Sequence, residues 1–184
     1  MPMRITQYGE EILRQKARPV VDFTPELANL VKRMLKTMYA ANGVGLAAEQ
    51  VGETCALCVI DVPAEVECKE YVEGNASIPM PLVLVNPTIT AREGEQRDDE
   101  GCLSFPEITA LVTRALHVTV RYQDVEGHPH EITAHGLLAR AVQHELDHLD
   151  GVLFIDHISP LQKVAIAGKL RRLQKESAAA AKLH

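Results

Sequence analysis

The feature that most constrains this chain is a pair of histidines four residues apart in a segment with helical periodicity. His144 and His148 enclose Glu145 in the pattern His-Glu-Leu-Asp-His. At about 100° per residue, positions 144 and 148 lie about 40° apart on one face of a helix. Two imidazoles at this spacing can bind one metal ion, and the glutamate beside them can act on a nearby water. The sequence therefore predicts a buried, metal-binding helix over residues 136–151.

A catalytic metal site of this type needs a third protein ligand. The long form of the motif, found in one class of zinc proteases, places a histidine where this chain has Phe154, which cannot bind metal. His157 comes three residues too late, and we expect it to be solvated. The remaining candidate is Cys102, in the segment Glu-Gly-Cys-Leu-Ser-Phe-Pro over residues 100–106. This context is more typical of a functional loop than of a core strand, but the residues alone leave open a simple buried cysteine.

A third segment, Gly-Val-Gly-Leu-Ala-Ala-Glu-Gln over residues 43–50, formally matches a dinucleotide-binding fingerprint. That fingerprint requires a strand before it and a helix after it. Here a predicted helix precedes it and a predicted strand follows, so we reject the nucleotide interpretation. The glycines indicate instead that another chain approaches this backbone closely.

The hydrophobic periodicity predicts helices and strands in an order that lacks strand–helix–strand alternation. This order favours the α+β class over a doubly wound sheet. We expect Pro87 to end one of the strands, and we expect residues 63–81 to form a surface loop. The predicted helices run from Thr24 to Asn42, over residues 136–151 and from Ser159 onward, and the predicted strands cover residues 54–62, 82–86, 117–122 and 130–134.

Length and composition fit one globular domain over residues 1–184. Apolar residues make up 46% of the chain and charged residues 24%, as in ordinary globular proteins. The net charge of −6 argues against specific DNA binding. From Pro160 onward, however, six Lys and Arg residues accompany one Glu. We therefore predict a basic C-terminal helix over residues 160–184, with Leu161, Val164 and Leu170 packed on the core.

The chain shows no targeting or membrane signal. No apolar run approaches the ~18 residues needed to cross a membrane, and the first residues lack the apolar region of a signal peptide. We therefore expect a cytoplasmic protein with reduced cysteines and no membrane partner. Cys55 and Cys58 match C-x-x-C, but on a strand positions three apart point to opposite faces and cannot chelate one ion.

Taken together, residues 43–50, 100–104 and 143–148 resemble, in order and spacing, the three signature motifs of the peptide deformylase family. The resemblance covers most of the chain and is similar to the bacterial type with an extended helical end. It implies small antiparallel sheets packed around the central metal-binding helix. Two features depart from the family pattern: Glu49 occupies a variable position of the first motif, and the long 63–81 loop has the character of an insertion.

The resemblance implies removal of the formyl group from N-formyl-methionyl ends of new polypeptides, with release of formate. Cys102, His144 and His148 would hold the metal ion, and Glu145 would transfer the proton between water and the leaving amine. The remaining implied residues act on the substrate. The Gln50 side-chain amide and the Leu103 backbone N–H would bind the oxyanion, the Gly45 backbone would pair with the substrate as an added strand, and Val44, Leu137 and Ala141 would line the methionine pocket.

The identity of the metal differs between the two lines of argument. Two imidazoles, one thiolate and an open position suit zinc by ligand softness. The resemblance implies Fe²⁺, with Ni²⁺, Co²⁺ or Zn²⁺ as substitutes, and we expect Fe²⁺ because softness predicts affinity rather than cellular supply. The resemblance also implies docking to the ribosome through the basic C-terminal helix.

Two other functions compete with the deformylase. A zincin-type endopeptidase would use the His-Glu-x-x-His pattern alone and would cleave internal peptide bonds. A non-catalytic metal-binding module would fill the fourth metal position with protein, but the sequence offers no obvious fourth ligand near the motifs.

Overall fold

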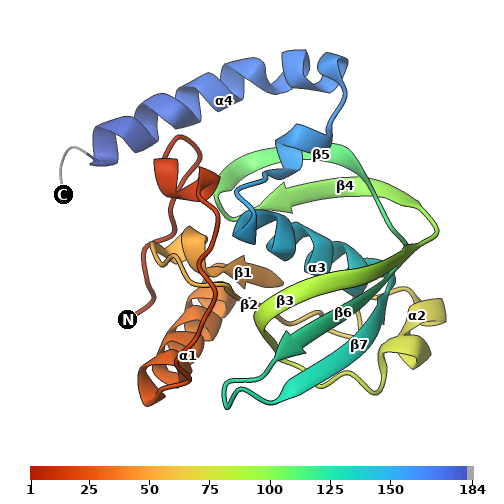
Figure 1. The fold of residues 1–184 in the computed structure, drawn as a ribbon. Coiled ribbons are helices and arrows are strands. Elements are labelled where there is room, and N and C mark those ends of the chain that lie inside the picture. Colours follow the sequence, from red (N-terminus) through yellow and green to blue (C-terminus); the bar gives the residue numbers. More distant parts are fainter. Residues whose placement is uncertain (182–184) are drawn as a thin grey trace.

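The computed structural model of the protein describes residues 1–181 and has two sheets with one helix between them (Figure 1). Its helices are α1 (Pro25–Ala40), α2 (Lys69–Asn75), α3 (Gly136–Leu149) and α4 (Pro160–Ala181), with short 3₁₀ helices η1 (Glu11–Arg14), η2 (Ala48–Val51) and η3 (Phe154–His157). Its strands are β1 (Gly45–Ala47), β2 (Leu57–Ile60), β3 (Leu82–Glu93), β4 (Gln96–Cys102), β5 (Phe105–Arg114), β6 (His117–Gln123) and β7 (Pro129–His135).

The larger sheet is antiparallel, in the order β1-β2-β3-β6-β7, and the smaller sheet pairs β4 with β5. Helix α3 lies between these sheets in the centre of the molecule (Figure 1). Its apolar face packs on the larger sheet, where Leu138, Val142 and Leu146 meet Leu84 and Val120. Burial of this interface, at roughly 25 cal/mol per Å² of apolar surface, fixes α3 in place.

Two outer helices close the remaining faces. Helix α1 covers part of the larger sheet, with Met34 and Met38 fully buried against β2. Helix α4 crosses the opposite end of the molecule above the β4–β5 sheet (Figure 1), and its Leu173 packs with Phe105 and Phe154. Within residues 1–181, no helix is both long and apolar enough to cross a membrane.

The α+β class, the main helices and the β6–β7 hairpin confirm the sequence predictions. Pro87 does not end its strand, however, because β3 continues to Glu93. The proline lies where the pairing of β3 with β6 shifts register between Val85 and Thr88, and Asn86 there has a positive φ of 49°. An irregularity of this kind tolerates a residue that lacks a backbone N–H.

The expectation that residues 63–81 form a surface loop is wrong in one respect, because the segment contains the helix α2, which has no buried residue. Strands β4 and β5 escaped prediction. Strand β4 reads Gln-Arg-Asp-Asp-Glu-Gly-Cys, and in a two-stranded sheet that exposes most of these residues the alternation of apolar side chains is absent. In α4, Leu161 and Val164 are 80% and 74% exposed rather than packed on the core, whereas Leu170 does contact it.

Candidate active site

Helix α3 brings the two histidines of the motif into the protein interior. His144 is 8% exposed and His148 is 2% exposed, because the helix has protein on nearly every side. Their Nε2 atoms lie 3.2 Å apart, as their spacing of one helical turn predicts. The prediction of a buried helix with both histidines on one face is therefore confirmed, and its metal binding stays a prediction.

The third ligand candidate arrives from the smaller sheet. Cys102 is the last residue of β4, so it belongs to a strand end rather than to the expected loop, and its Sγ lies 3.3 Å from His148 Nε2. The ligand atoms of Cys102, His144 and His148 all lie within 4.8 Å of one another. Ligands on a tetrahedral ion with bonds of about 2.1 Å are about 3.4 Å apart, so this set of donors fits one divalent metal.

Gln50 connects the first motif to this cluster. Its side-chain oxygen accepts a hydrogen bond from the Ala47 backbone N–H at 2.9 Å, which fixes the orientation of the amide. The side-chain nitrogen then donates to Cys102 Sγ at 3.3 Å and to Ser104 Oγ at 3.1 Å. All three motifs thus meet at one point, with the Gln50 nitrogen beside the candidate metal ligands.

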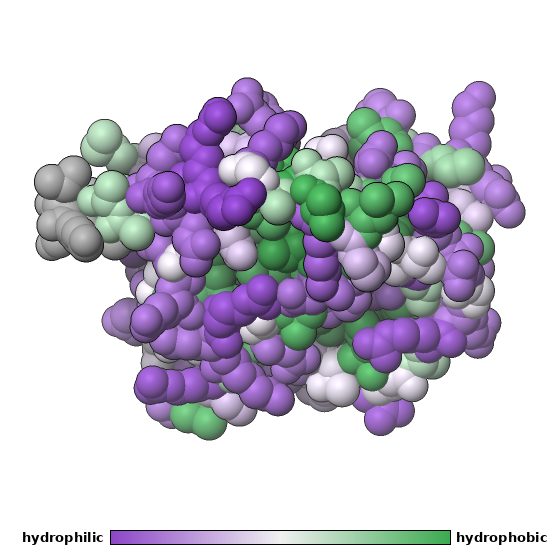
Figure 2. Space-filling model, turned by 90° about the horizontal axis from the view of Figure 1, so that it is seen from above, coloured by the Kyte–Doolittle hydropathy of each residue, from purple (hydrophilic) through white to green (hydrophobic). Residues whose placement is uncertain are grey.

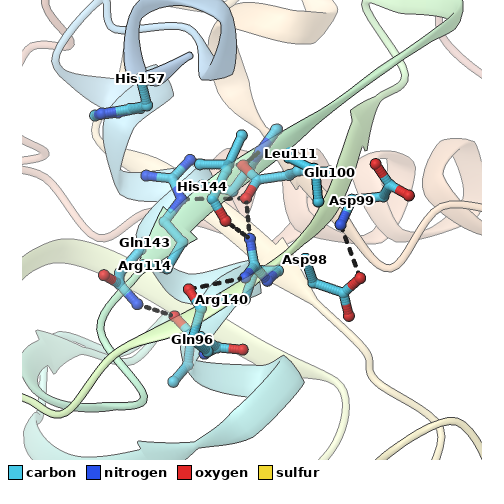
Figure 3. Close-up of polar contacts among 12 residues, drawn as sticks. Gln96, Asp98, Asp99, Glu100, Leu111, Arg114, Arg140, Gln143, His144 and His157 are labelled. Carbon is cyan, nitrogen blue, oxygen red and sulfur yellow. Dashed lines mark hydrogen bonds and ion pairs between the residues drawn. The ribbon is translucent and has the colours of Figure 1, made fainter. Parts of the chain in front are cut away.

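A buried carboxylate, Glu100, contacts His144 of this cluster (Figure 3). Glu100 Oε1 lies 2.5 Å from His144 Nδ1, and the same carboxylate accepts hydrogen bonds from Arg114 and Arg140. Burial alone would raise the pKa of Glu100, but the bonds to His144 and Arg114 hold it well below its usual range. Glu100 therefore stays ionised and orients the imidazole, with Nε2 turned toward the candidate metal position.

The network continues from Arg114 to a second carboxylate on α3. Arg114 Nη1 also donates to Asp147 Oδ2, at 2.5 Å, and His157 Nε2 lies 2.7 Å from the same carboxylate oxygen. His157 is exposed, as expected, but it is not merely solvated, because it pairs with Asp147. A depression of about 790 Å³ lies beside these residues, separate from the candidate metal ligands.

Glu145 faces the opposite direction, toward the first motif. It is 4% exposed, and burial raises the pKa of its carboxyl group to about 7. A Cβ atom at Gly45 would overlap the Glu145 carboxylate. At Gly43, a Cβ atom would lie 2.7 Å from Leu103 Cδ1. The groups that approach these two glycines are therefore side chains of the protein itself, not the second chain that the sequence predicted.

A cavity of about 510 Å³ opens in front of the cluster. All of the predicted site residues except His148 line it. His148 is 2% exposed, and its Nε2 lies 3.3 Å from Cys102 Sγ and 3.2 Å from His144 Nε2. Val44 is 38% exposed at its edge. Together these residues make a recess with polar groups at its floor and apolar groups on its walls, as in a typical small-molecule site. The lining residues predicted from sequence are Val44, Gly45, Gln50, Cys102, Leu103, Leu137, Ala141, His144 and Glu145.

Sequence reasoning did not foresee the supporting charges Arg114, Arg140 and Asp147. It also gave no role to Glu49, which is fully buried with both carboxylate oxygens unpartnered among the described residues. Burial raises the pKa of Glu49 to about 8, and repulsion from Glu145 adds to the increase. The sequence did contain a signal for this residue, because Glu49 is the one charged residue in the otherwise uncharged segment 43–50.

The fold and this site have the arrangement expected of a metal-dependent hydrolase, with Cys102, His144 and His148 as the candidate ligands. The family model for polypeptide deformylase matches residues 2–164. A peptide deformylase of Opitutus terrae is 44% identical over 190 residues, covering 100% of this chain and 99% of the relative. One from Desulfitobacterium hafniense is 49% identical over 153 residues, covering 83% and 92%.

Solved structures agree. The crystal structure of a peptide deformylase from Legionella pneumophila has a TM-score of 0.82 at 40% identity, covering 97% of this chain and 98% of the other. That of Synechococcus elongatus, in complex with actinonin, has a TM-score of 0.80 at 42% identity, covering 91% and 88%. The chain belongs to the polypeptide deformylase family, metal-dependent hydrolases that remove the formyl group from new polypeptides. The family does not favour the zincin-type alternative.

Glu49 yields a test of the electrostatics beside the site. A carboxyl group whose pKa rises from 4.5 to about 8 on folding keeps its proton in the folded state while the unfolded state loses it. The raised pKa therefore lowers the free energy of unfolding. This loss of stability is absent below pH 4.5, grows between about pH 4.5 and 8, and reaches its full size above pH 8. We expect Glu49→Gln to gain stability over the unmodified protein across this window. At 1.36 kcal/mol per pKa unit, the upper bound is about 5 kcal/mol.

The measurement is urea unfolding of both proteins, with metal bound, at a series of pH values. Because any fixed packing cost of glutamine is independent of pH, only the change in the difference is diagnostic. A difference that stays constant from pH 4.5 to 8 would contradict the raised pKa.

Proposed function

We propose that Cys102, His144 and His148 are the metal ligands of this deformylase and that the 510 Å³ cavity receives the formylated end of the substrate. The observation that carries the proposal is the convergence of the ligand atoms of Cys102, His144 and His148 within 4.8 Å of one another, with Cys102 and His144 in the lining of that cavity. When bound, the metal ion polarises the formyl carbonyl and increases the acidity of water.

Glu145 is the proton-transfer group of the proposal. It lines the cavity beside the ligands, and a carboxyl group with a pKa of about 7 exchanges protons readily near neutral pH. In this role it takes a proton from the attacking water and delivers it to the amine that leaves. The Gln50 side-chain nitrogen, 3.3 Å from Cys102 Sγ, and the Leu103 backbone N–H are the donors that bind the developing oxyanion.

The substrate backbone pairs with β1 in this proposal. Strand β1 lies at an edge of the five-stranded sheet and pairs with β2 on one side only. In this proposal the backbone of the substrate pairs with the other side of β1, at Gly45, as an added strand. Backbone pairing requires no particular sequence and suits an enzyme that must accept many polypeptides. The methionine side chain then enters the apolar part of the cavity, between Val44, Leu137 and Ala141.

The physiological metal of the proposal is Fe²⁺, with Ni²⁺, Co²⁺ or Zn²⁺ able to replace it. The choice of iron rests on membership of the family, because the two imidazoles and one thiolate would also suit zinc. Metal analysis of protein purified without oxygen distinguishes iron from zinc.

We also propose that the enzyme consists of a single domain and that it acts in the cytoplasm. Helix α4 packs through Leu173 on the same cluster as β5, which supports a single domain over residues 1–184, of which 182–184 lie outside the described residues. All four cysteines are free thiols, and a thiolate ligand at Cys102 requires the reducing conditions of the cytoplasm.

Replacing Glu145 tests the catalytic assignment. We expect Glu145→Gln to keep about one metal ion per chain while formate release from formyl-Met-Ala-Ser falls at least ~100-fold, as for a lost acid–base group. Cys102→Ser provides the contrast, because loss of a ligand should lower the metal content itself. Loss of metal from Glu145→Gln would make Glu145 a ligand and would contradict the assignment, and an active Cys102→Ser protein with full metal content would exclude Cys102.

We further propose that α4 binds the ribosome through its basic residues. The substrate emerges from a particle coated with RNA phosphate, and the rest of the chain is acidic. Lys169, Arg171, Arg172 and Lys175 are all exposed on α4. Figure 2 looks down on the face that carries α4 and shows hydrophilic side chains over much of the surface toward the end of this helix.

Changing Lys169, Arg171, Arg172 and Lys175 together to Gln should lower co-sedimentation with ribosomes in low salt. The apparent affinity of the unmodified protein should fall steeply with salt. Activity on a short formyl peptide should survive, because none of the four residues lines the cavity. Lys32, Arg33 and Lys36, exposed on α1, provide the control set. Equal ribosome binding by both sets of variants would make α4 a structural helix only.

A further inference from the structure

Helix α3 begins without a cap of its own. Strand β7 ends at His135 and the helix starts at the next residue, Gly136. His135 has extended dihedral angles and makes no side-chain capping bond, and Gly136 has a φ of +61°. Because the first N–H groups of a helix find no acceptor within it, this junction requires acceptors from elsewhere in the chain.

Two distant segments supply these acceptors. The Gly136 N–H donates to the Leu116 carbonyl oxygen at 3.0 Å. The next two N–H groups, of Leu137 and Leu138, donate to the two carboxylate oxygens of Glu67 at 3.2 and 3.1 Å. Glu67 lies about 70 residues earlier, in the 63–81 segment, and a carboxylate at a helix N-terminus also complements the helix dipole.

The same segment holds the preceding residue. The Asn75 side-chain amide donates to the His135 carbonyl at 3.1 Å and accepts the His135 N–H at 3.0 Å. Asn75 Nδ2 also lies 3.3 Å from Glu67 Oε2. At Gly136 a Cβ atom would overlap the Tyr71 ring. The 63–81 segment therefore encloses the strand-to-helix junction with three side chains, a role that an ordinary surface loop does not have.

This junction forms part of the substrate cavity. Leu137, whose N–H bonds to Glu67, lines the cavity with its side chain, and Ala141 lies one turn further along the same wall. The candidate metal ligands on α3 come two turns later, where Glu100 orients His144 independently. A loosened first turn would therefore displace the apolar wall more than the metal site.

We propose that Glu67 is a positioning residue that sets the place of Leu137 and thereby the fit of the first side chain of the substrate. The proposal rests on the assignment of the 510 Å³ cavity as the substrate site, made above. It gives the 63–81 segment a function in selectivity, through the backbone of α3 and without contact with the substrate.

The test compares Glu67→Gln with the unmodified protein and with Glu70→Gln, an exposed carboxylate on α2. Glutamine removes the charge and one acceptor. In Glu67→Gln we expect faster hydrogen exchange at the Leu137 and Leu138 amides. We also expect a KM for formyl-Met-Ala-Ser about three- to tenfold higher, with kcat and metal content unchanged. The preference for formyl-Met over formyl-Leu peptides should fall, and Glu70→Gln should change none of these quantities.

Glu67→Asp keeps a carboxylate and should restore part of the lost preference, and it replaces Glu67→Gln if that variant does not fold. Faster amide exchange with unchanged KM and preference would reduce Glu67 to a structural cap and overturn the proposal. Unchanged exchange would overturn the capping role itself. Amide hydrogen exchange does not depend on enzyme activity, so it tests the capping role separately from the proposed function. If the unmodified protein does not act on formyl peptides, the assignment of the cavity as the substrate site is refuted, and the exchange result still stands.

Discussion

The arrangement of the site depends on one buried carboxylate. Glu100 is 6% exposed and forms hydrogen bonds with Arg114, Arg140 and His144, which come from β5 and α3. A buried ion needs such partners, because its desolvation costs several kcal/mol that charge pairing must offset. Glu100 therefore joins the smaller sheet to the central helix and orients a candidate metal ligand at the same time.

This interaction explains why two small sheets can build one site. The β4–β5 pair contributes Cys102 at the end of β4, and α3 contributes the two histidines. Without a fixed contact between them, the sulfur and the two nitrogens would not stay within reach of one ion. Arg114 extends the contact to Asp147, next to His148, so that charged groups hold α3 on the side that faces the smaller sheet, while apolar packing holds the side that faces the larger one.

Much of the site was predictable from sequence because its key spacings are local. The turn between His144 and His148 follows from helical geometry, and the three motifs together identified Cys102 and Gln50. The supporting residues were not predictable in this way. Arg114 and Arg140 lie 14 and 40 residues from Glu100 in the chain, and only the folded structure shows which of 19 basic residues meets which acid.

The errors in the predicted fold also come from elements whose contacts are not local. Periodicity predicts an element when one face of it is buried, as in α3 and β6. It fails for β4, whose side chains are mostly exposed, and for α2, which contains no buried residue. In the 63–81 segment, Glu67 and Asn75 form hydrogen bonds with backbone groups far away in the chain, and contacts of this kind leave no pattern in the sequence.

The most direct test of the central claim is the metal affinity of Glu100→Gln, with Glu100→Asp as a milder change and Asp98→Asn, exposed on the same strand, as a control. Dissociation constants measured by competition with a chelator, on samples shown to be folded by circular dichroism, give the answer. We predict metal binding about 10- to 100-fold weaker for Glu100→Gln, as for the loss of a carboxylate that orients a ligating histidine, and no change for Asp98→Asn. A folded Glu100→Gln protein that binds the metal as tightly as the unmodified chain would contradict the account.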